Sequence, residues 1–387
     1  MKHAHARYFT AMNKEEQSMT DITTHNAPTS IEDAIDSALK GSGKINVIIA
    51  GKTGVGKSTL INTIFRGDLA KTGSGRPVTQ RTEEISKAGH PVTIIDTKGL
   101  ELKDHDTIAA ELTDVIDTRS HSQDENQHIH VAWLCIHEDG RRVEDAEIDL
   151  CRLFAEKKIP VVAVITKSRS DNGFNEEVRQ TLPTAAAVVS VRALAEELDD
   201  EGDSITLKPK GLDKLILETA RLLPEAKKRA YANALSSRHQ AATRLKIEQA
   251  EKEVIIAATA AGAVAAVPIP FSDAVGLVPI QVGMLAKIGI TFGMEISTTA
   301  LTTLVTSTLG AGAATLIGRT LVTGLLKMIP GAGSVVGGTI AAATATALTK
   351  ALGSAYISVL TTFIQENPGK DLDMSLIAAE LKKRISI

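Results

Sequence analysis

The sequence predicts two architectures in one chain: an α/β domain with a mostly parallel sheet covered by helices, followed by an all-α domain rich in alanine and glycine. Between residues 44 and 223, short runs of β-branched residues alternate with amphipathic segments, which is the pattern of parallel strands connected by helices. Residues 254–365 differ in kind, because these 112 residues carry only six charges and show no strand signal.

The composition allows two or three domains, each with its own core. Of the 387 residues 43% are hydrophobic, so the chain can bury enough apolar surface to fold without disulfides. Cys135 and Cys151 lie in apolar segments and match neither a disulfide framework nor a metal-ligand spacing, as expected in a reducing cytosol. The formal net charge of −3, with acids and bases interspersed, predicts no nucleic-acid partner.

Four segments are expected along the chain. A flexible polar tail at 1–30 precedes the α/β domain at 31–225, which begins with a short helix at Ile31–Lys40. A basic connecting helix at 226–253 then leads to the apolar helical domain at 254–387. The α/β domain is expected to contain the strands INVIIA, VTIIDT, HIHVAWLCI, IPVVAVIT and AAAVVSV, and a polar surface loop at 199–211.

A glycine-rich segment lies where the first predicted strand meets a helix. Residues 51–58, GKTGVGKS, fit the pattern G-x-x-x-x-G-K-[ST] in that context. The glycines let backbone N–H groups turn inward around a phosphate, and the helix dipole reinforces the binding. Lys57 is expected to neutralise the β and γ phosphates, and the Ser58 hydroxyl to coordinate Mg²⁺. The expected ligand-binding residues of this loop are Gly51, Lys52, Thr53, Gly54, Val55, Gly56, Lys57, Ser58 and Thr59.

A carboxylate and a glycine end the strand segment VTIIDTKGL. Asp96 is expected to hold Mg²⁺ through water, while the backbone N–H of Gly99 reaches the γ-phosphate. Hydrolysis removes the group that Gly99 holds, so the segment beyond it should loosen and the site can act as a switch.

A second hydroxyl is needed to close over Mg²⁺ and the γ-phosphate. Thr72, Thr79 and Thr82 compete for this role, and the stiff Pro77 close before it favours Thr79. The predicted catalytic residues are therefore Lys57, Thr79 and Gly99, and the predicted metal ligands are Ser58, Thr79 and Asp96.

These motifs together carry a resemblance to known families. GKTGVGKSTLINTIF, TGSGRPVTQ, IIDTKGLE and VITKS, in this order and spacing, resemble the translation-factor-class GTPases, especially Era-like, septin-like and interferon-inducible members. The resemblance covers residues 46 to about 192 and implies a P-loop NTPase G domain that binds GTP or GDP with Mg²⁺ and hydrolyses GTP. Further on, VPIPFSDAVGLVPIQVGMLAKIG and IPGAGSVVGGTIAAATATALTKALGSAYI resemble the apolar helical domain of YcjF-type bacterial proteins.

The guanine-reading segment departs from the usual pattern Asn/Thr-Lys-x-Asp. Thr-Lys at 166–167 is followed by Ser-Arg-Ser, so the carboxylate of Asp171 comes two residues late. If Asp171 loops back to the guanine N1 and N2 donors, GTP specificity is retained; otherwise the preference for guanine weakens. Lys167 still matches, with its stem stacked on the base, so GTP is favoured over ATP. The predicted base-binding residues are Lys167, Asp171, Ser190, Val191 and Arg192.

A second departure concerns hydrolysis. Leu100 stands where many members of the class carry a glutamine that orients water, and a leucine cannot position water by hydrogen bonding. Intrinsic hydrolysis is therefore expected to be slow, with activation by a group that a second G domain or another partner supplies. No catalytic base is assigned.

Two explanations compete for residues 254–365. Uncharged runs of 23 and 22 residues are long enough to span a bilayer, and small residues at 333–337 allow tight helix contact in lipid. Pro268, Pro270, Pro279 and Pro330 interrupt the runs, however, and aromatic anchors are few, so a soluble or conditionally inserting bundle is favoured.

The leading functional hypothesis is a cytoplasmic nucleotide switch whose G domain controls the exposure or membrane engagement of the helical domain. Its predicted partners are a guanine nucleotide, a second G domain in a homodimer, and the inner-membrane surface or a protein, with the helical domain peripheral to the membrane or inserted in it. Two alternatives remain: an interaction scaffold whose dimerisation the nucleotide gates, and an effector whose helices permeabilise membranes.

Overall fold

The chain forms two compact units. The computed structural model describes residues 30–70, 83–97, 105–200, 203–265, 273–294 and 342–386. One unit is Ser42–Lys246, and the other joins the described residues up to Gly41 to those from Ile247 onward. Helix α2 (Ile31–Lys40), which the sequence analysis grouped with the α/β domain, therefore belongs to the helical unit, where it packs on α10 (Asp273–Phe292).

A mostly parallel sheet forms the centre of the first unit, as predicted, and it has six strands because β2 (Glu83–Ser86) joins the five that the sequence predicted. Its strand order is β2-β3-β1-β4-β5-β6, and every neighbouring pair is parallel except β2 with β3. The fold class is thus a P-loop-type α/β sheet followed by a helical region. The strands are β1 (Ile45–Gly51), β2 (Glu83–Ser86), β3 (Val92–Asp96), β4 (Val131–His137), β5 (Val161–Thr166) and β6 (Ala187–Ser190).

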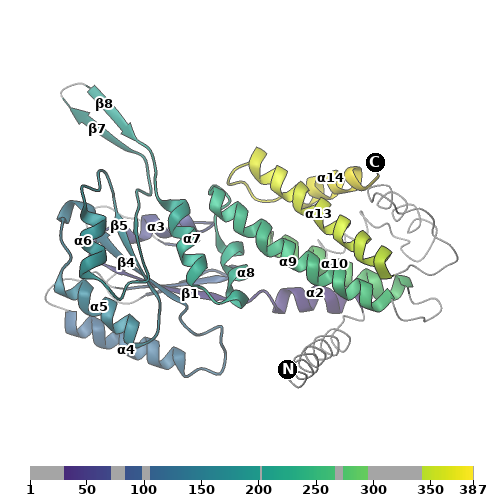
Figure 1. Cartoon of the computed structure of the whole chain (residues 1–387), viewed down its shortest axis with the longest axis horizontal. Coiled ribbons are helices and arrows are strands. Elements are labelled where there is room, and N and C mark those ends of the chain that lie inside the picture. The colour runs from purple at the N-terminus through teal and green to yellow at the C-terminus, as the bar shows by residue number, and fades with distance from the viewer. Residues whose placement is uncertain are drawn as a thin grey trace, which may run out of the picture. The chain divides into compact units, whose positions relative to one another are not determined.

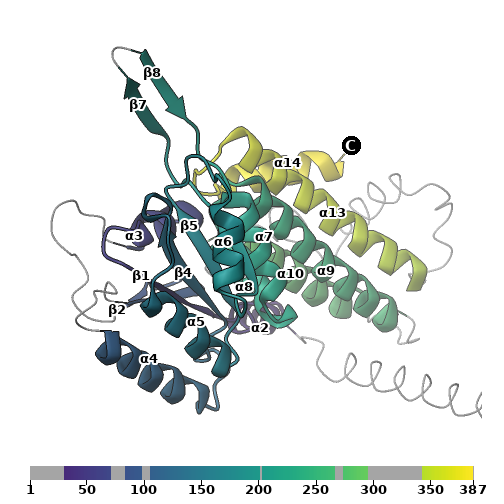
Figure 2. The ribbon, with the colours of Figure 1, turned by 60° about the vertical axis from the view of Figure 1, so that its left-hand side comes forward.

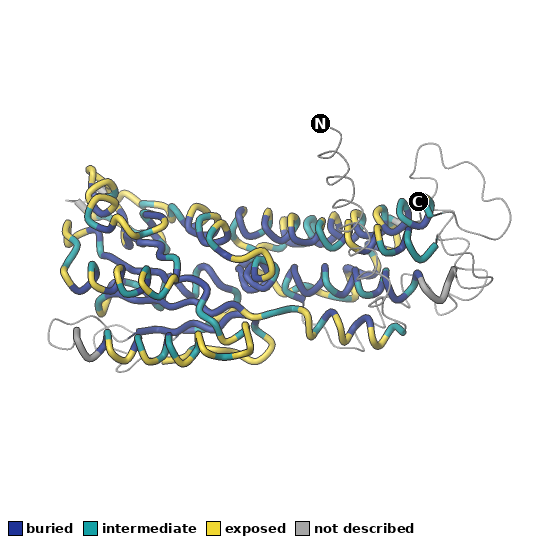
Figure 3. The backbone as a smooth tube through the Cα atoms, turned by 60° about the horizontal axis from the view of Figure 1, so that its bottom comes forward, coloured by how far each residue is buried: buried dark blue, intermediate teal, exposed yellow. Residues whose placement is uncertain are grey.

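Helices cover both faces of this sheet (Figure 2). Because successive strand residues point to opposite faces, Val47 and Ile49 pack on one layer of helices while Ile48 packs on the other. All seven residues of β1 are buried, and the central strands appear almost wholly buried along their length (Figure 3). The first layer contains α3 (Lys57–Ile64), α7 (Leu212–Leu222) and α8 (Glu225–Ala234), and the second contains α4 (His105–Ser120), α5 (Asp145–Glu156) and α6 (Phe174–Thr181).

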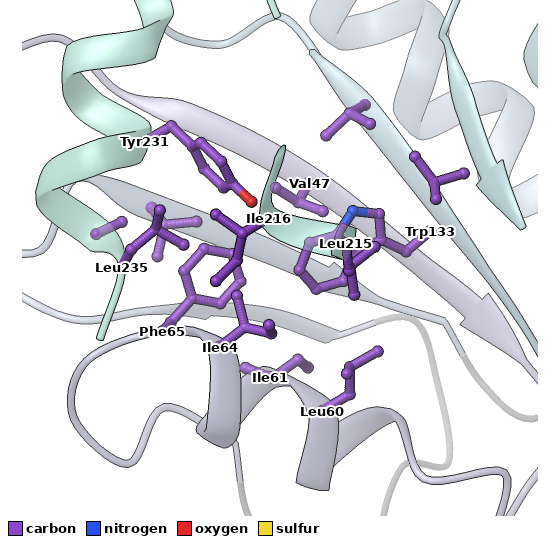
Figure 4. Close-up of a cluster of buried hydrophobic side chains, with 14 of the residues drawn as sticks. Val47, Leu60, Ile61, Ile64, Phe65, Trp133, Leu215, Ile216, Tyr231 and Leu235 are labelled. Carbon is purple, nitrogen blue, oxygen red and sulfur yellow. The ribbon is translucent and has the colours of Figure 1, made fainter. Parts of the chain in front are cut away.

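Three aromatic side chains pack together in the core between the sheet and the helices α3 and α8 (Figure 4). Trp133 of β4 stacks on Phe65 with ring centroids 5.6 Å apart, and Tyr231 of α8 meets Phe65 edge-on at 6.3 Å. The indole N–H of Trp133 donates to the hydroxyl of Thr219 at 3.0 Å, so this buried polar atom is satisfied. Phe65, the residue that follows α3, is packed against Trp133 of the sheet and Tyr231 of α8.

A two-stranded hairpin replaces the surface loop that the sequence predicted at 199–211. β7 (Glu196–Asp200) pairs antiparallel with β8 (Asp203–Leu207), and Leu198 faces Ile205 across the pair. The hairpin extends away from the sheet of its unit (Figure 1). The prediction was wrong because acidic residues hide the short strand pattern; Ile205 remains 63% exposed, so no core signal marks the segment.

The helical unit packs its helices closely through glycine. A Cβ added to Gly353 of α13 (Ala342–Glu366) would lie 2.5 Å from Cγ2 of Val254 on α9 (Gln240–Ala265) and 3.0 Å from the sulfur of Met284 on α10. α14 (Met374–Ser386) then packs against α13. The predicted connecting helix at 226–253 is in fact two helices, because α8 ends before α9 begins.

One described helix, α13, is long and apolar enough to cross a membrane, and half of its most apolar window is buried inside its unit. A salt bridge of 3.2 Å joins Lys287 of α10 to Glu253 of α9, so one of the few charges in the apolar segment is paired within the bundle. Residues 266–272 and 295–341 of the predicted apolar segment lie outside the described residues.

Candidate nucleotide-binding site

The loop between β1 and α3 has the backbone conformation that a phosphate site requires. Gly51, Gly54 and Gly56 have φ angles of 145°, 76° and 104°, which are unfavourable for residues with a side chain. At Gly51 a Cβ would also lie 2.4 Å from the carbonyl oxygen of Cys135 on the neighbouring strand, whereas at the other two glycines the space is open. Gly51 is thus needed for close approach, and Gly54 and Gly56 for the turn.

Helix α3 begins immediately after this loop, at Lys57. Its N-cap is Gly56, and no side chain caps the first turn, so the N-terminal N–H groups are not bonded by a capping side chain. The backbone of this turn can therefore bind an anion, and the side chains of Ser58 and Thr59 lie half-buried within it.

Lys57 brings a positive charge into the loop. Its side chain is only 8% exposed, and Nζ donates to the carbonyl oxygen of Gly51 at 2.8 Å and to that of Lys52 at 3.4 Å. A buried ammonium group held by the loop's own carbonyls lies inside the turn, where a polyphosphate would supply stronger charged acceptors. The structure thus places the Lys57 ammonium group inside the loop, and its contact with the phosphates stays a prediction.

A second charged contact at the loop was not predicted. Lys52 forms a salt bridge with Glu144, which is the N-cap of α5 and forms a capping box with Glu147. The hydrogen bond from Lys52 lowers the pKa of Glu144, whereas burial raises the pKa of Glu147. No sequence signal could have revealed this pair, because a loop lysine and a helix cap 92 residues apart carry no shared pattern.

The strand register brings Asp96 to the loop. Ile49 of β1 pairs with Asp96 of β3, and the N–H of Thr97 donates to the carbonyl oxygen of Ile49 at 3.0 Å. Asp96 is 2% exposed, so its carboxylate lies within the carboxyl end of the sheet. Burial raises the pKa of the Cys135 thiol to about 12, and the nearby charges of Lys57 and Asp96 act on this pKa in opposite directions.

Two predicted site residues, Thr79 and Gly99, lie outside the described residues, as do the competing Thr72 and Thr82 and the substituted Leu100. Within the described ranges no cluster of three or more His, Cys, Asp or Glu side chains is arranged to hold a metal ion. The predicted Mg²⁺ ligands there are one carboxylate, Asp96, and one hydroxyl, Ser58. That small hard-oxygen set fits an ion that takes its other ligands from phosphates and water.

The segment expected to read the base is folded around a buried glutamate. Lys167 follows the end of β5 and has a φ of 51°, and the next residue, Ser168, donates from its hydroxyl to Glu138 at 2.5 Å. The other carboxylate oxygen of Glu138 accepts the N–H groups of Arg169 and Ser170. These three bonds lower the pKa of Glu138, although its burial acts in the opposite direction and is the largest influence.

Asp171 is engaged at the start of α6. Its Oδ1 accepts the backbone N–H of Asn175 at 2.8 Å, while Arg141 donates to the carbonyl oxygen of Asp171 at 2.6 Å. Asn175 in turn donates from Nδ2 to the hydroxyl of Ser190 at 2.9 Å. An open pocket of about 380 Å³ borders these groups and is lined by Asp171, Asn175, Glu176, Arg179, Ser190 and Lys214.

The two remaining predicted base-binding residues are held by neighbouring backbone. The N–H of Val191 donates to the carbonyl oxygen of Ile165 at 2.7 Å. Arg192 donates from its guanidinium to the carbonyl oxygens of Ser168 at 3.0 Å and Lys208 at 2.8 Å. The structure therefore brings Lys167, Val191 and Arg192 together at one edge of the sheet.

Comparison with known proteins identifies two families in this chain. Residues 46–167 match the family described as 50S ribosome-binding GTPase, and residues 226–384 match a domain of unknown function, DUF697. Among solved structures, the Era protein of Aquifex aeolicus is 20% identical with a TM-score of 0.33, and the match covers 56% of this chain and 67% of that one.

Two curated proteins are similar over shorter segments. Translocase of chloroplast 90 of Arabidopsis thaliana is 46% identical over 57 residues, which is 14% of this chain and 7% of the translocase. Septin-12 of Homo sapiens is 34% identical over 83 residues, which is 20% of this chain and 22% of the septin. The chain therefore spans less than a quarter of either relative. This chain thus joins a segment that matches a GTPase family, at residues 46–167, to a segment that matches DUF697, at residues 226–384.

Proposed function

We propose that this protein binds GTP with Mg²⁺, hydrolyses it slowly, and uses the bound state to control its helical unit. The observation that carries the proposal is the loop between β1 and α3. This loop contains three glycines with positive φ angles and the buried ammonium group of Lys57, and it leads into a helix start that no side chain caps. Convergent N–H groups and one cation are what a triphosphate needs.

Each residue of the site has a distinct role in this proposal. The N–H groups of residues 51–59 hold the phosphate oxygens, and Lys57 neutralises negative charge that accumulates on the β and γ phosphates. Ser58 and Asp96 would hold Mg²⁺ with Thr79, and the ion supplies charge neutralisation between the two phosphates. Gly99 would hold the γ-phosphate through its N–H, so its contact is present only before hydrolysis.

The far end of α3 supports a route from the nucleotide to the rest of the chain. Phe65, which follows α3, forms an antiparallel bridge with Leu235 in the link between α8 and α9. The N–H of Ser236 donates to the carbonyl oxygen of Ile64 at 2.9 Å, and Nε2 of His239 lies 2.7 Å from that of Thr63. A displacement of the P-loop helix would therefore act directly on the link that begins α9.

Lys246 fixes α9 to the same link. Its side chain is fully buried, and Nζ donates to the carbonyl oxygens of Ala232 at 2.5 Å and Asn233 at 3.4 Å. Helix α9 continues without a break to Ala265, where Val254 and Ala261 belong to the core of the helical unit. Helix α9 thus begins in the first unit, up to Lys246, and continues in the helical unit from Ile247, and this shared helix supports control of one unit by the other.

The nucleotide-binding part of the proposal is tested by calorimetry with GTP and Mg²⁺. Lys57→Ala removes the charge inside the loop and is expected to weaken binding by roughly 100-fold or more, since hydrogen bonds to charged groups are each worth about 1.5–3 kcal/mol. Lys87→Ala, an exposed lysine between β2 and β3 near the opposite edge of the sheet, is the matched control. Equal GTP affinity in the two variants would reject the assigned site.

The switch is tested by partitioning of the full chain into a mild detergent phase. Apo, GDP-bound and non-hydrolysable GTP-bound samples are compared, with the Lys57→Ala variant under the same conditions. We expect the partitioned fraction of the wild type to depend on the nucleotide and that of the variant to stay constant. Identical partitioning of all three wild-type samples would remove the control of the helical unit while leaving nucleotide binding intact.

A further inference from the structure

The carboxylate that distinguishes guanine from adenine is not yet assigned. Guanine presents two donors, N1–H and the N2 amino group, and one acceptor, O6. A site that selects guanine therefore needs acceptors for the two donors and a donor for O6. Adenine has no N1 proton and carries an amino group in place of O6. If Lys167 stacks on the base, as its resemblance to the GTPase pattern implies, the groups that select guanine lie near it, at the carboxyl ends of β5 and β6.

Arg169 occupies the position where the usual pattern has its aspartate, two residues after Lys167. A guanidinium cannot accept a hydrogen bond, so it cannot replace that carboxylate at N1 and N2. It can donate to O6, and adenine would place an amino group against it. The position is therefore suited to read one half of the guanine edge.

Two nearby carboxylates have other partners. Glu138 is 4% exposed and already accepts hydrogen bonds from the Ser168 hydroxyl and from two backbone N–H groups. Asp171 accepts the N–H of Asn175 at the start of α6. Turning Asp171 toward a base would leave this helix N–H without its acceptor, and losing such a cap costs about 1 kcal/mol.

Asp139 lies 3.7 Å from Nη1 of Arg169, whereas Glu196, the first residue of β7, forms the closer pair with this guanidinium. Both oxygens of its carboxylate lie 3.1 Å from Nε of Arg169, and one also accepts from Nη2 in a bidentate pair. The side chain of Glu196 is 30% exposed and that of Arg169 43%, so both are open to a ligand. The hydrogen bond from Arg169 is the main cause that lowers the pKa of Glu196, and the charges of Arg192 and Lys167 act in the same direction, so the carboxylate is ionised beside the predicted base-binding residues.

We propose that Glu196 and Arg169 together read the guanine base, with the Glu196 carboxylate accepting from N1–H and N2 and the Arg169 guanidinium donating to O6. This inference rests on the proposed GTP binding and names the residues that make it specific. A carboxylate has about four lone-pair positions and a guanidinium five N–H groups, so the pair can hold each other and the base at the same time. The hairpin β7–β8 then serves to present Glu196.

The test compares GTP, xanthosine triphosphate and ATP in the full chain with Mg²⁺, by calorimetry. Xanthine has an oxygen in place of the N2 amino group, so Glu196→Gln, which offers an amide donor, should bind it better. We expect this variant to lose GTP affinity by roughly 10- to 100-fold and to shift its ratio of GTP to xanthosine triphosphate affinity in favour of the latter. Glu197→Gln, the exposed neighbour on the same strand, is the matched control and should keep the wild-type ratio.

The variant Asp171→Asn tests whether Asp171, rather than Glu196, is the carboxylate that selects guanine. We expect it to keep the wild-type ratio of nucleotide affinities, because its carboxylate caps α6; a ratio that shifts in this variant and not in Glu196→Gln would overturn the inference. An unchanged ratio in Glu196→Gln, with normal GTP binding, would also overturn it and leave the proposed function in place. If the wild type binds no purine triphosphate at all, the proposed function fails first. The fluorescence of Trp133 checks that each variant is folded.

Discussion

Acid should destabilise the G domain in part through His130, a buried histidine whose neutral form is built into the sheet. His130 precedes β4 and is 7% exposed, and its Nδ1 accepts the backbone N–H of Asn46 at 3.0 Å. An imidazolium has no acceptor nitrogen, so protonation breaks this bond and buries a charge. Burial, followed by the charge of Lys227, lowers the pKa of His130 from 6.5 to about 4.

The sign and size of the change in unfolding free energy follow from the difference between the folded-state and unfolded-state pKa of His130. A folded pKa below the unfolded one means that the unfolded chain binds the extra proton, so the stabilisation is complete above pH 6.5 and is lost as the pH falls toward 4. At about pH 5 the unfolded-state pKa of 6.5 lies 1.5 pH units above the solution. At about 1.4 kcal/mol per unit, His130 then costs about 2 kcal/mol of unfolding free energy relative to pH 7.5.

The assay is urea unfolding at about pH 7.5 and pH 5, followed by the fluorescence of Trp133, the only tryptophan of the chain and a core residue of this domain. His130→Asn keeps an acceptor for the N–H of Asn46 but cannot titrate. We expect the variant to lose about 2 kcal/mol less than the wild type between the two pH values, and exposed His121→Asn to behave as the wild type. Equal losses in wild type and His130→Asn would refute the reasoning.

Three glycine substitutions give further tests. Gly51→Ala should destabilise the G domain by about 3 kcal/mol or more and abolish GTP binding, because its Cβ meets the Cys135 carbonyl oxygen. Gly54→Ala has open space around its Cβ, so it should cost only about 1–2 kcal/mol of backbone strain in the same urea assay. Gly353→Ala should lower the stability of the helical unit by about 1–3 kcal/mol, measured by far-ultraviolet circular dichroism. The substitution of its exposed neighbour, Ser354→Ala, should leave this stability unchanged. A Gly353→Ala variant as stable as the wild type would show that α9 and α13 have room to separate.

The sequence predicts the sheet and the phosphate loop well for a physical reason. Parallel strands buried on both faces read as continuous apolar runs, and a loop that wraps a phosphate needs glycines at fixed positions, so both features are local in the chain. The strands containing Val47, Trp133 and Val164 were all found where the apolar runs placed them. The segment at Glu196 was not, since two exposed strands with acidic side chains leave no apolar alternation to detect.

The basic stretch at 227–246, which runs from α8 into α9, shows what a local sequence pattern cannot predict. With six basic residues and no acidic one, this stretch by itself predicts a solvated helix face that could meet anionic lipid headgroups, yet Lys227 and Lys246 are buried. Lys227 donates to the side chain of Asn126, about 100 residues earlier, and Lys246 to carbonyls at the end of α8. Burial lowers the pKa of Lys246 well below its ordinary value, so this side chain acts in the core as a hydrogen-bond donor. Any attraction of this stretch to lipid must therefore come from the other four basic residues, and the buried pair contributes instead to holding α8 and α9 on the G domain.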